Sequence, residues 1–333
     1  MTAPSVLLCP GQGAYVPGAL AEVRHLFHVR DTLRAVDAFS PGGPYTATRL
    51  LTDLSAPPPE QLIRASPLAF DLATYAGTVA AARALRFHFG HRPDAVVGHS
   101  VGDLAALAAA EAIAPVTGAA VLAARHRLLV GTPTPPGGLV ALAASAEATE
   151  ELLSLADGHG VRVAADNAPR QTVVSGPEPG LTAVEAVARG KGVRTTRLTG
   201  RTLYHHPLLT PVAGRLSALL RRTTVRPPTV PLYSSVRAAP LVTLEDIRRS
   251  ALAHLIHPVR FRQALLALQR SGIRLFIDAG PGALLGALAR ATVPAARVLA
   301  PLHRRNTLER VEERLRPALG RSRPSAEPVR GRP

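Results

Sequence analysis

The chain has 333 residues, of which 47% are hydrophobic and 19% are charged, a balance typical of a folded globular protein rather than a disordered one. Its formal charge of +16 is carried by 38 arginines and a single lysine, Lys191. Because aromatic residues make up only 4% and interleave with no basic cluster, we expect no nucleic-acid binding. The charge better fits a negatively charged small protein or a phosphorylated cofactor.

The first part of the chain predicts alternating strands and helices. Ser5–Cys9 is a short buried strand that stops at Pro10 and the Gly-Gln-Gly turn at 11–13. Helical patterns follow to about residue 37 and over 59–89. A second strand at 95–97 runs into residues 98–102, and helices are predicted over 103–113 and 115–129.

A Pro/Gly loop at 132–138 marks a change of pattern. Strand, helix, two strands, helix and strand follow in turn, at 139–143, 146–156, 161–165, 171–175, 181–189 and 193–198. This βαββαβ order is the ferredoxin-like split motif, so we predict a small subdomain at 132–198.

The α/β pattern then resumes, which places the rest of the chain with the first part. Helices are predicted at 211–221, 243–255 and 262–271, and strands at 230–233 and 275–277. The fold class is therefore α/β: an α/β-hydrolase-like large subdomain with a parallel sheet, from 1–131 and 199–318, and the inserted small one. Residues 319–333, rich in Arg, Pro, Ser and Gly, predict a disordered tail.

Several features bear on where the protein works. The lone cysteine, Cys9, excludes an internal disulfide framework and fits a reducing cytosol, and its apolar neighbours predict a buried thiol. No basic stretch leads into a long apolar core, so we see no secretory signal. The apolar segment 104–124 holds Glu111 and is broken at Pro115, which predicts two packed helices and no membrane span. We expect a cytoplasmic protein with no bound metal.

Residues 98–102, Gly-His-Ser-Val-Gly, have the G-x-S-x-G form between a predicted strand and a predicted helix. Such a turn projects the serine hydroxyl outward at the helix N-terminus. The helix dipole and the amide of Val101 would favour a developing oxyanion. We therefore predict that Ser100 is a nucleophile rather than a turn residue.

A serine nucleophile needs a base at neutral pH. The chain has twelve histidines, so composition cannot select one. His205 and His206 stand in a loop that enters a helix, where a side chain can reach a cleft.

Together these patterns resemble the malonyl-CoA:acyl carrier protein transacylase family, which includes the acyltransferase domains of polyketide synthases. The resemblance covers the chain from Gly11 to about Leu288. Its motifs are Gly11-Gln12-Gly13, Gly98-His99-Ser100-Val101-Gly102, Arg125, Asn167-Ala168-Pro169-Arg170-Gln171, Tyr204-His205-His206-Pro207-Leu208-Leu209 and Gly280-Pro281-Gly282.

The resemblance implies a role for each matching residue. His205 falls on the family's base, and His206 takes the place of a serine. A backbone carbonyl around His254 would orient the imidazole; glutamine or asparagine is usual there, so His254 departs from the pattern. The amides of Gln12 and Val101 would form the oxyanion hole.

By the same resemblance, Arg125 is the family's buried arginine, 25 residues beyond the nucleophile. Its planar guanidinium pairs bidentately with a carboxylate, so it would bind the free carboxylate of malonyl or methylmalonyl. An acetyl group would leave that charge unpaired. Tyr204, Asn167 and His99 are further predicted substrate-binding residues.

The implied reaction moves a malonyl-type acyl group from coenzyme A to the phosphopantetheine thiol of an acidic acyl carrier protein, with no bound cofactor. We expect a discrete, monomeric enzyme. Three alternatives stay open: an editing thioester hydrolase, a non-catalytic module that docks carrier proteins, and a transferase that loads an unusual acyl or aminoacyl group between carriers. The stretch Thr202-Leu203-Tyr204-His205 matches neither selector pattern of the family, so the acyl group is left open.

Overall fold

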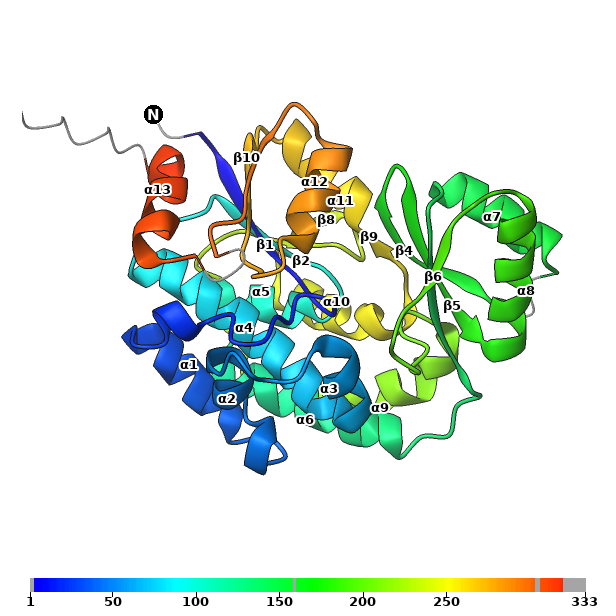
Figure 1. Ribbon diagram of the computed structural model, residues 1–333, viewed down its shortest axis with the longest axis horizontal. Helices are drawn as coiled ribbons and strands as arrows, with labels where there is room; N and C mark the ends of the chain where they lie inside the picture. The colour runs from blue at the N-terminus through cyan, green and yellow to red at the C-terminus, as the bar shows by residue number, and fades with distance from the viewer. Residues whose placement is uncertain (1–2, 158–159, 303–305, 320–333) are drawn as a thin grey trace, which may run out of the picture.

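The computed structural model describes residues 3–157, 160–302 and 306–319, which form two sheets with their helices (Figure 1). The six-stranded sheet has the order β11-β10-β1-β2-β7-β8. Its strands are β1 (Ser5–Cys9), β2 (Ala95–Gly98), β7 (Leu232–Ser234), β8 (Ala239–Leu241), β10 (Leu275–Asp278) and β11 (Arg297–Leu299). All neighbours pair in parallel except β7 and β8. Because β1 and β2 are covered on both faces, every residue in them is buried.

Helices cover both faces of this sheet. They are α1 (Phe27–Asp37), α2 (Ala47–Thr52), α3 (Pro59–Ala65), α4 (Pro67–Phe87), α5 (Gly102–Ala109), α6 (Pro115–Val130), α9 (Thr210–Arg222), α10 (Leu244–Ile256), α11 (Phe261–Arg270), α12 (Leu284–Thr292) and α13 (Leu308–Leu319). The single helix predicted over 59–89 is two, since Ser66 caps α4 by accepting a hydrogen bond from the Ala69 amide and Pro67 starts the new helix.

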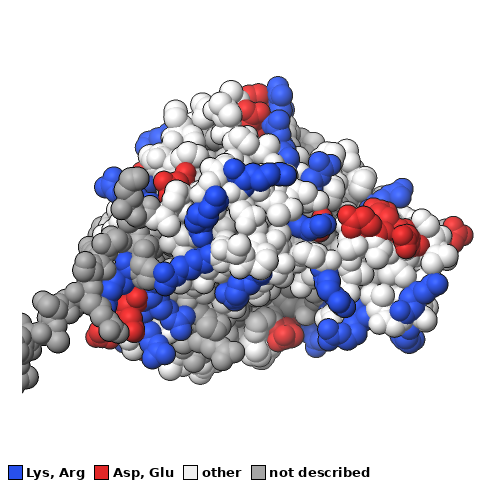
Figure 2. Space-filling model, turned by 90° about the horizontal axis from the view of Figure 1, so that it is seen from above, with Lys and Arg blue, Asp and Glu red and all other residues white. Residues whose placement is uncertain are grey.

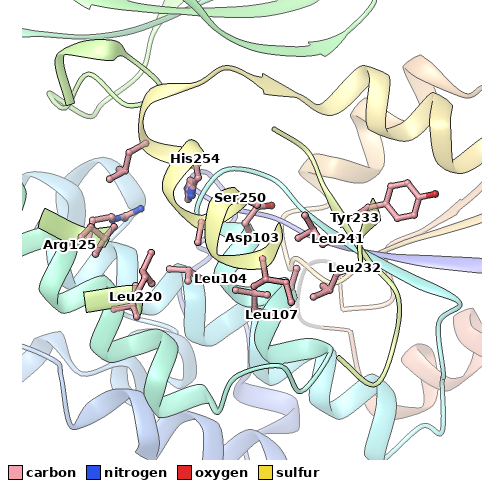
Figure 3. Close-up of a pocket in the computed structure, with 16 residues that line it drawn as sticks. Asp103, Leu104, Leu107, Arg125, Leu220, Leu232, Tyr233, Leu241, Ser250 and His254 are labelled. Atoms are coloured by element: carbon pink, nitrogen blue, oxygen red, sulfur yellow. The ribbon is translucent and has the colours of Figure 1, made fainter. Parts of the chain in front are cut away.

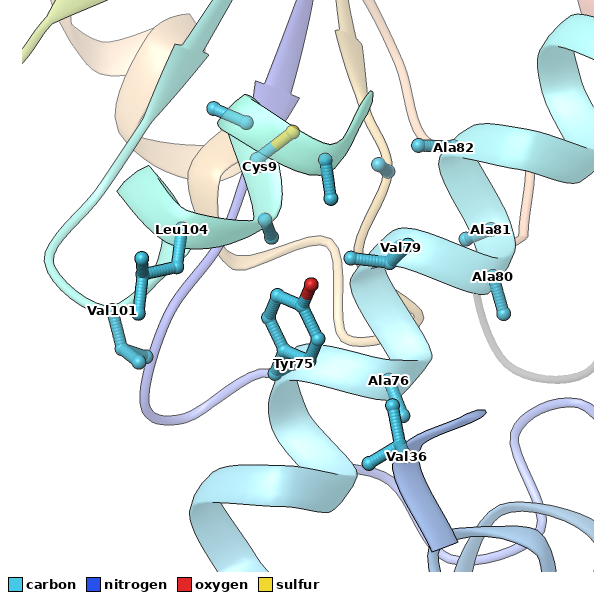
Figure 4. Packing of buried hydrophobic residues seen from close by; sticks show 14 of the residues in the cluster. Cys9, Val36, Tyr75, Ala76, Val79, Ala80, Ala81, Ala82, Val101 and Leu104 are labelled. Atoms are coloured by element: carbon cyan, nitrogen blue, oxygen red, sulfur yellow. The ribbon is translucent and has the colours of Figure 1, made fainter. Parts of the chain in front are cut away.

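Helix α4 lies in the centre of the large core. Its buried residues include Asp71, Tyr75 and the run from Val79 to Ala82, packed near Cys9 and Leu104 (Figure 4). The Tyr75 hydroxyl donates a hydrogen bond to the carbonyl of Pro115 at 3.0 Å. A helix surrounded by protein on this scale holds its polar side chains in a fixed, dry position, which matters for Asp71 below. The buried thiol predicted for Cys9 is confirmed.

The second sheet is antiparallel apart from one parallel strand pair, and it carries two helices, α7 (Ala146–Leu155) and α8 (Glu178–Gly190). Its order is β6-β3-β5-β4-β9, from β3 (Gly137–Leu142), β4 (Arg162–Ala168), β5 (Gln171–Pro177), β6 (Thr195–Arg197) and β9 (Val259–Arg260). The predicted α/β class with its βαββαβ unit is confirmed. The division at residues 131/132 and 198/199 stays a prediction, because β9 joins this sheet from far along the chain, parallel to β4.

Some predicted element boundaries differ from those in the structure. The helix predicted to reach residue 113 ends at Ala109, and Glu111 beyond it has a positive φ of 59°. Short elements such as β8, β11 and α13 were not predicted. The tail predicted at 319–333 lies outside the described residues, apart from Leu319, where α13 ends. Within the described ranges, no helix is long and apolar enough to cross a membrane.

The surface carries the positive excess in a dispersed form. On the face shown in Figure 2, basic side chains are spread across the molecule rather than gathered in one patch. Acidic side chains gather toward the small-sheet end, where α7 exposes Glu147, Glu150 and Glu151.

Candidate active site

Ser100 stands at the turn between β2 and α5, at the carboxyl end of a central strand. Its φ is +56°, a left-handed backbone conformation that costs energy for a residue with a side chain and that is concentrated at functional sites. The turn packs tightly against the loop after β1: a Cβ on Gly11 would lie 2.5 Å from the carbonyl oxygen of His99 and 3.1 Å from the amide nitrogen of Val101. Glycine is therefore required for that loop to reach the elbow.

His205 lies within hydrogen-bonding distance of Ser100. Its Nε2 lies 2.9 Å from the Ser100 hydroxyl oxygen, and its Nδ1 lies 3.1 Å from the main-chain carbonyl oxygen of His257. Because a carbonyl can only accept, Nδ1 carries the proton and Nε2 is left as the acceptor for the serine hydroxyl. His205 also has a positive φ, 61°, so both members of the pair are held in sparsely populated backbone conformations.

The carbonyl that holds the imidazole comes from a position later than the sequence predicted. The expected position was around His254, which lies inside α10; the 3.1 Å bond goes to His257, where the helix ends and the backbone turns to φ −107° and ψ 153°. A helix end leaves its last carbonyls free to accept. The ring of His254 stacks on that of His205 with centroids 5.6 Å apart.

Burial keeps this imidazole uncharged. Desolvation, the neighbouring His99 and Arg125 together lower the pKa of His205 to about 3, against the opposing hydrogen bonds from the backbone of His257 and His254. Burial also lowers the pKa of His99 and, more strongly, that of His254. At neutral pH the site therefore holds neutral imidazoles, and His205 is ready to accept a proton.

The amides expected to form an oxyanion hole belong to the elbow and to the loop that packs on it. Val101 follows the nucleophile and precedes the first residue of α5, and Gln12 lies in the loop that packs on the elbow. Among the described residues, neither main-chain amide donates a hydrogen bond to another protein group. Unpaired amides near a helix N-terminus are suited to hold a developing negative charge.

Arg125 is buried, as expected, but its charge is already paired. Its Nη2 lies 2.8 Å from Oδ2 of Asp71, and the other Asp71 oxygen accepts a hydrogen bond from the side-chain amide of Gln12 at 3.0 Å. Only 3% of Arg125 and 4% of Asp71 is exposed. Burial acts to lower the pKa of Arg125, but Tyr204 and Asp71 outweigh it and raise that pKa, so the guanidinium stays charged.

Sequence reasoning missed Asp71. The signal was present, since Asp71 is the one acidic residue in the stretch that forms α4. A carboxylate surrounded by protein is rare unless it is paired, and its partner lies 54 residues away in α6.

The other predicted substrate-binding residues lie around the same cleft. The Tyr204 ring sits under the Arg125 guanidinium at 5.3 Å, within cation–π range. Nε2 of His99 lies 2.7 Å from the side-chain oxygen of Asn167, whose amide nitrogen donates to Gln171. His99 and Asn167 are thus tied to each other at the elbow.

His206 is held apart from the reacting groups. Its Nε2 donates to the carbonyl of Gly160 at 2.6 Å, and its Nδ1 accepts from the amide of Leu208. The ring therefore caps the short 3₁₀ turn at Pro207–Leu209 and positions the segment that carries His205.

Two hollows adjoin the Arg125–Asp71 pair. An open groove of about 700 Å³ is lined by Gln12, Asp71, Tyr204 and residues 197–202. Behind the pair, Arg125 and His254 stand at one end of a cavity whose other walls are mostly aliphatic (Figure 3). That cavity measures only about 30 Å³, room for little more than a water molecule. Over the described ranges, no group of acidic, histidine and cysteine side chains is arranged to hold a metal ion.

An α/β core with a serine at a strand-to-helix elbow and an inserted antiparallel subdomain defines an acyltransferase fold. Residues 69–321 match the family described as acyl transferase domain. Polyketide synthase GfsB from Streptomyces halstedii is 36% identical over 219 residues, which are 65% of this chain and 4% of that protein. This chain therefore spans a small part of that relative.

Solved structures agree with the sequence comparison. The acyltransferase domain from the second module of the salinomycin polyketide synthase superposes with a TM-score of 0.80 at 26% identity, over 96% of this chain and 74% of that one. A malonyl-transacylase in complex with its type II polyketide synthase acyl-carrier protein gives 0.83 at 21% identity, over 96% and 100%. The chain belongs to the acyl transferase domain family, as its motifs predicted, and it is an acyltransferase.

Proposed function

We propose that this acyltransferase moves an acyl group from a coenzyme A thioester to the phosphopantetheine thiol of an acyl carrier protein, through a covalent acyl-Ser100 intermediate. One observation carries the proposal: the Ser100 hydroxyl lies 2.9 Å from Nε2 of a neutral, buried His205. A positioned base of this kind turns a weak alcohol into a nucleophile.

The first half-reaction acylates Ser100, with His205 as the base. Ser100 Oγ attacks the thioester carbonyl while its proton passes to Nε2 of His205, and the His257 carbonyl stabilises the imidazolium through Nδ1. The amides of Gln12 and Val101 hold the tetrahedral oxyanion. The carbon–sulfur bond then breaks, and the coenzyme A thiolate leaves with the proton from Nε2. Ser100 is left as an ester, and His205 is neutral again.

The second half-reaction reverses these steps. The phosphopantetheine thiol of the carrier gives its proton to Nε2 of His205, and its sulfur attacks the acyl-Ser100 carbonyl. Collapse of the intermediate releases the Ser100 oxygen, which takes the proton back. A ping-pong rate law follows, because coenzyme A leaves the acyl-enzyme before the carrier thiol reacts with it.

A carrier protein as acceptor has two supports. The structural relative described above was solved with its acyl-carrier protein, and the +16 charge of this chain favours an acidic partner. We expect the reaction in the cytoplasm, by a monomer, with no cofactor beyond the thioester substrates.

Two acyl classes compete for the site. A malonyl-type group, with Arg125 bound to its carboxylate, is the choice that the family resemblance implies. An aminoacyl or other unusual acyl group is the second candidate, and the Asp71 carboxylate on Arg125 favours it.

Acceptor competition tests the reaction itself. Acyl-coenzyme A donors are mixed with the enzyme and a holo carrier protein, and free coenzyme A and carrier mass are followed together. The proposal predicts one acyl group on the carrier for each coenzyme A released, and no such gain with the apo carrier. Equal release of coenzyme A with water as the only acceptor would instead identify a thioester hydrolase.

A further inference from the structure

We propose that Asp71 sets the acyl specificity of this site: by neutralising Arg125, it makes the pocket select an acyl group that ends in an amino group over one that ends in a carboxylate. This inference rests on the proposed transfer through Ser100 and concerns only which acyl group enters.

The pair is built into the core rather than formed at the surface. Asp71 comes from α4 and Arg125 from α6, and both helices are fixed by the packing of the large subdomain. A buried ion pair at 2.8 Å is costly to separate, because either partner alone would be a bare charge in a dry site. Gln12 adds a hydrogen bond to the second carboxylate oxygen, so Asp71 has little freedom to swing away.

The charges of the buried groups around Arg125 then add up to zero, whereas the other arginines that line the groove, Arg64, Arg197 and Arg201, are exposed. The nearby imidazoles of His99, His205 and His254 are neutral because burial lowers each pKa. Burial also raises the pKa of Tyr204 to about 12, so its phenol is uncharged. With Arg125 matched by Asp71, a malonyl carboxylate would bring one uncompensated negative charge close to another, and such burial is strongly unfavourable.

The same pair offers hydrogen bonds to a different group. Each carboxylate oxygen of Asp71 can accept more than the one bond that it makes. Nε of Arg125 is a buried donor with no partner among the described residues, and it could pair only with an acceptor such as a carbonyl oxygen of the acyl group. An ammonium or amide N–H can donate to Asp71, and the charge of an ammonium is attracted to it.

The pair lies where an acyl chain would end. Asp71, Gln12 and Tyr204 line the open groove of about 700 Å³, whereas the cavity behind Arg125 and His254 holds only about 30 Å³. Gln12 lies in the loop that packs on the Ser100 elbow and Tyr204 precedes His205, so we infer that an acyl group on Ser100 reaches Asp71 through this groove. The cavity behind Arg125 leaves little room for it to pass further.

Three donors of similar size separate the possibilities: malonyl-, butyryl- and β-alanyl-coenzyme A, which end in a carboxylate, a methyl group and an ammonium. The rate of acyl-Ser100 formation is followed by intact-protein mass spectrometry. We expect β-alanyl to load at least about tenfold faster than malonyl in the natural sequence. Asp71→Asn, which keeps the shape and removes the charge, should lower this ratio at least about tenfold.

Asp31→Asn is the matched control. Asp31 also pairs with an arginine at 2.8 Å, but on the surface, so its loss should leave the donor ratio unchanged. A natural enzyme that loads malonyl faster than β-alanyl, or an Asp71→Asn variant that keeps the natural ratio, would overturn the inference. If Asp71→Asn does not fold, the ratio in the natural enzyme decides. If no donor acylates Ser100, the proposed function itself fails.

Discussion

The two ends of the active site are built differently. At the reacting end, Ser100 and His205 are adjacent, uncharged and held by a strained elbow and a helix-end carbonyl. At the acyl end, Arg125 and Asp71 are fully charged, buried and joined across two helices. The reacting end needs only local geometry to run acyl transfer, whereas the acyl end depends on a balance of charge that one distant residue can change. Chemistry and specificity are thus set by separate parts of the fold.

The largest expected effect is at the reacting end, where His205→Ala removes the base. We expect acyl transfer to fall about 10²- to 10⁴-fold, measured as the rate of acyl-enzyme formation under single-turnover conditions. The Arg125–Asp71 pair should be unaffected, so the preference among donors should persist in the residual rate.

His257→Ala is the control for this loss. The group that holds His205 is the backbone carbonyl of His257, which alanine retains, and the side chain of His257 is exposed. Its transfer rate should stay within about threefold of the natural enzyme. A loss as deep as that of His205→Ala would show that the His257 ring, and not its carbonyl, supports the base.

At the acyl end, Arg125→Met tests whether the pair is a buried unit. Removing one partner leaves the Asp71 charge alone in the core, at a cost of about 3 kcal/mol in the free energy of unfolding. Urea denaturation measures this loss. The double variant Arg125→Met with Asp71→Leu should regain most of it, and an Arg125→Met protein as stable as the natural one would contradict the buried pair.

The pH profile tests the reacting end, where His205 is the proposed base. An ordinary histidine, with a pKa near 6.5, loses most of its base form by pH 5. The pKa of His205 is lowered to about 3, so acylation should change less than about twofold between pH 7.5 and pH 5. A rate that falls with a midpoint near 6.5 would show that His205 is not the buried base.

The lowered pKa of His205 should also make the free energy of unfolding depend on pH. The unfolded chain takes up a proton on His205 below about pH 6.5, whereas the folded chain does so only near pH 3. Stability from this group is therefore complete above pH 6.5 and decreases as the pH falls toward 3.

The smallest effect is expected for His254→Gln. The imidazole of His254 stacks on His205, but it is uncharged at neutral pH, and the carbonyl bonded to Nδ1 of His205 belongs to His257. Transfer should change by less than about threefold. A larger loss, without a drop in melting temperature, would assign the ring a role of its own in tuning His205.

Sequence patterns located the reacting end because its geometry is local. The elbow at Ser100 is defined by five consecutive residues between a strand and a helix, and His205 follows from a motif in one loop. The carbonyl was placed near His254 rather than at His257, because the last turn of α10 could not be fixed from its pattern.

At the acyl end, the sequence predicted only one of the two paired residues. Arg125 followed from its spacing to Ser100, but the spacing says nothing about a partner on another helix. Asp71 and Arg125 meet only because α4 and α6 pack against each other, a tertiary contact that periodicity does not encode. Likewise, the pairing of β9 with β4 joins segments about 90 residues apart, and no local signal predicts it.

The most direct test of the account is the site of the acyl adduct. The natural enzyme is mixed with an acyl-coenzyme A donor, quenched in acid and digested, and the peptide that contains residue 100 is measured by mass spectrometry. The account predicts one acyl group on Ser100, absent in Ser100→Ala and removed when a holo carrier protein is added before the quench. An adduct on another residue, or transfer that continues in Ser100→Ala, would contradict it.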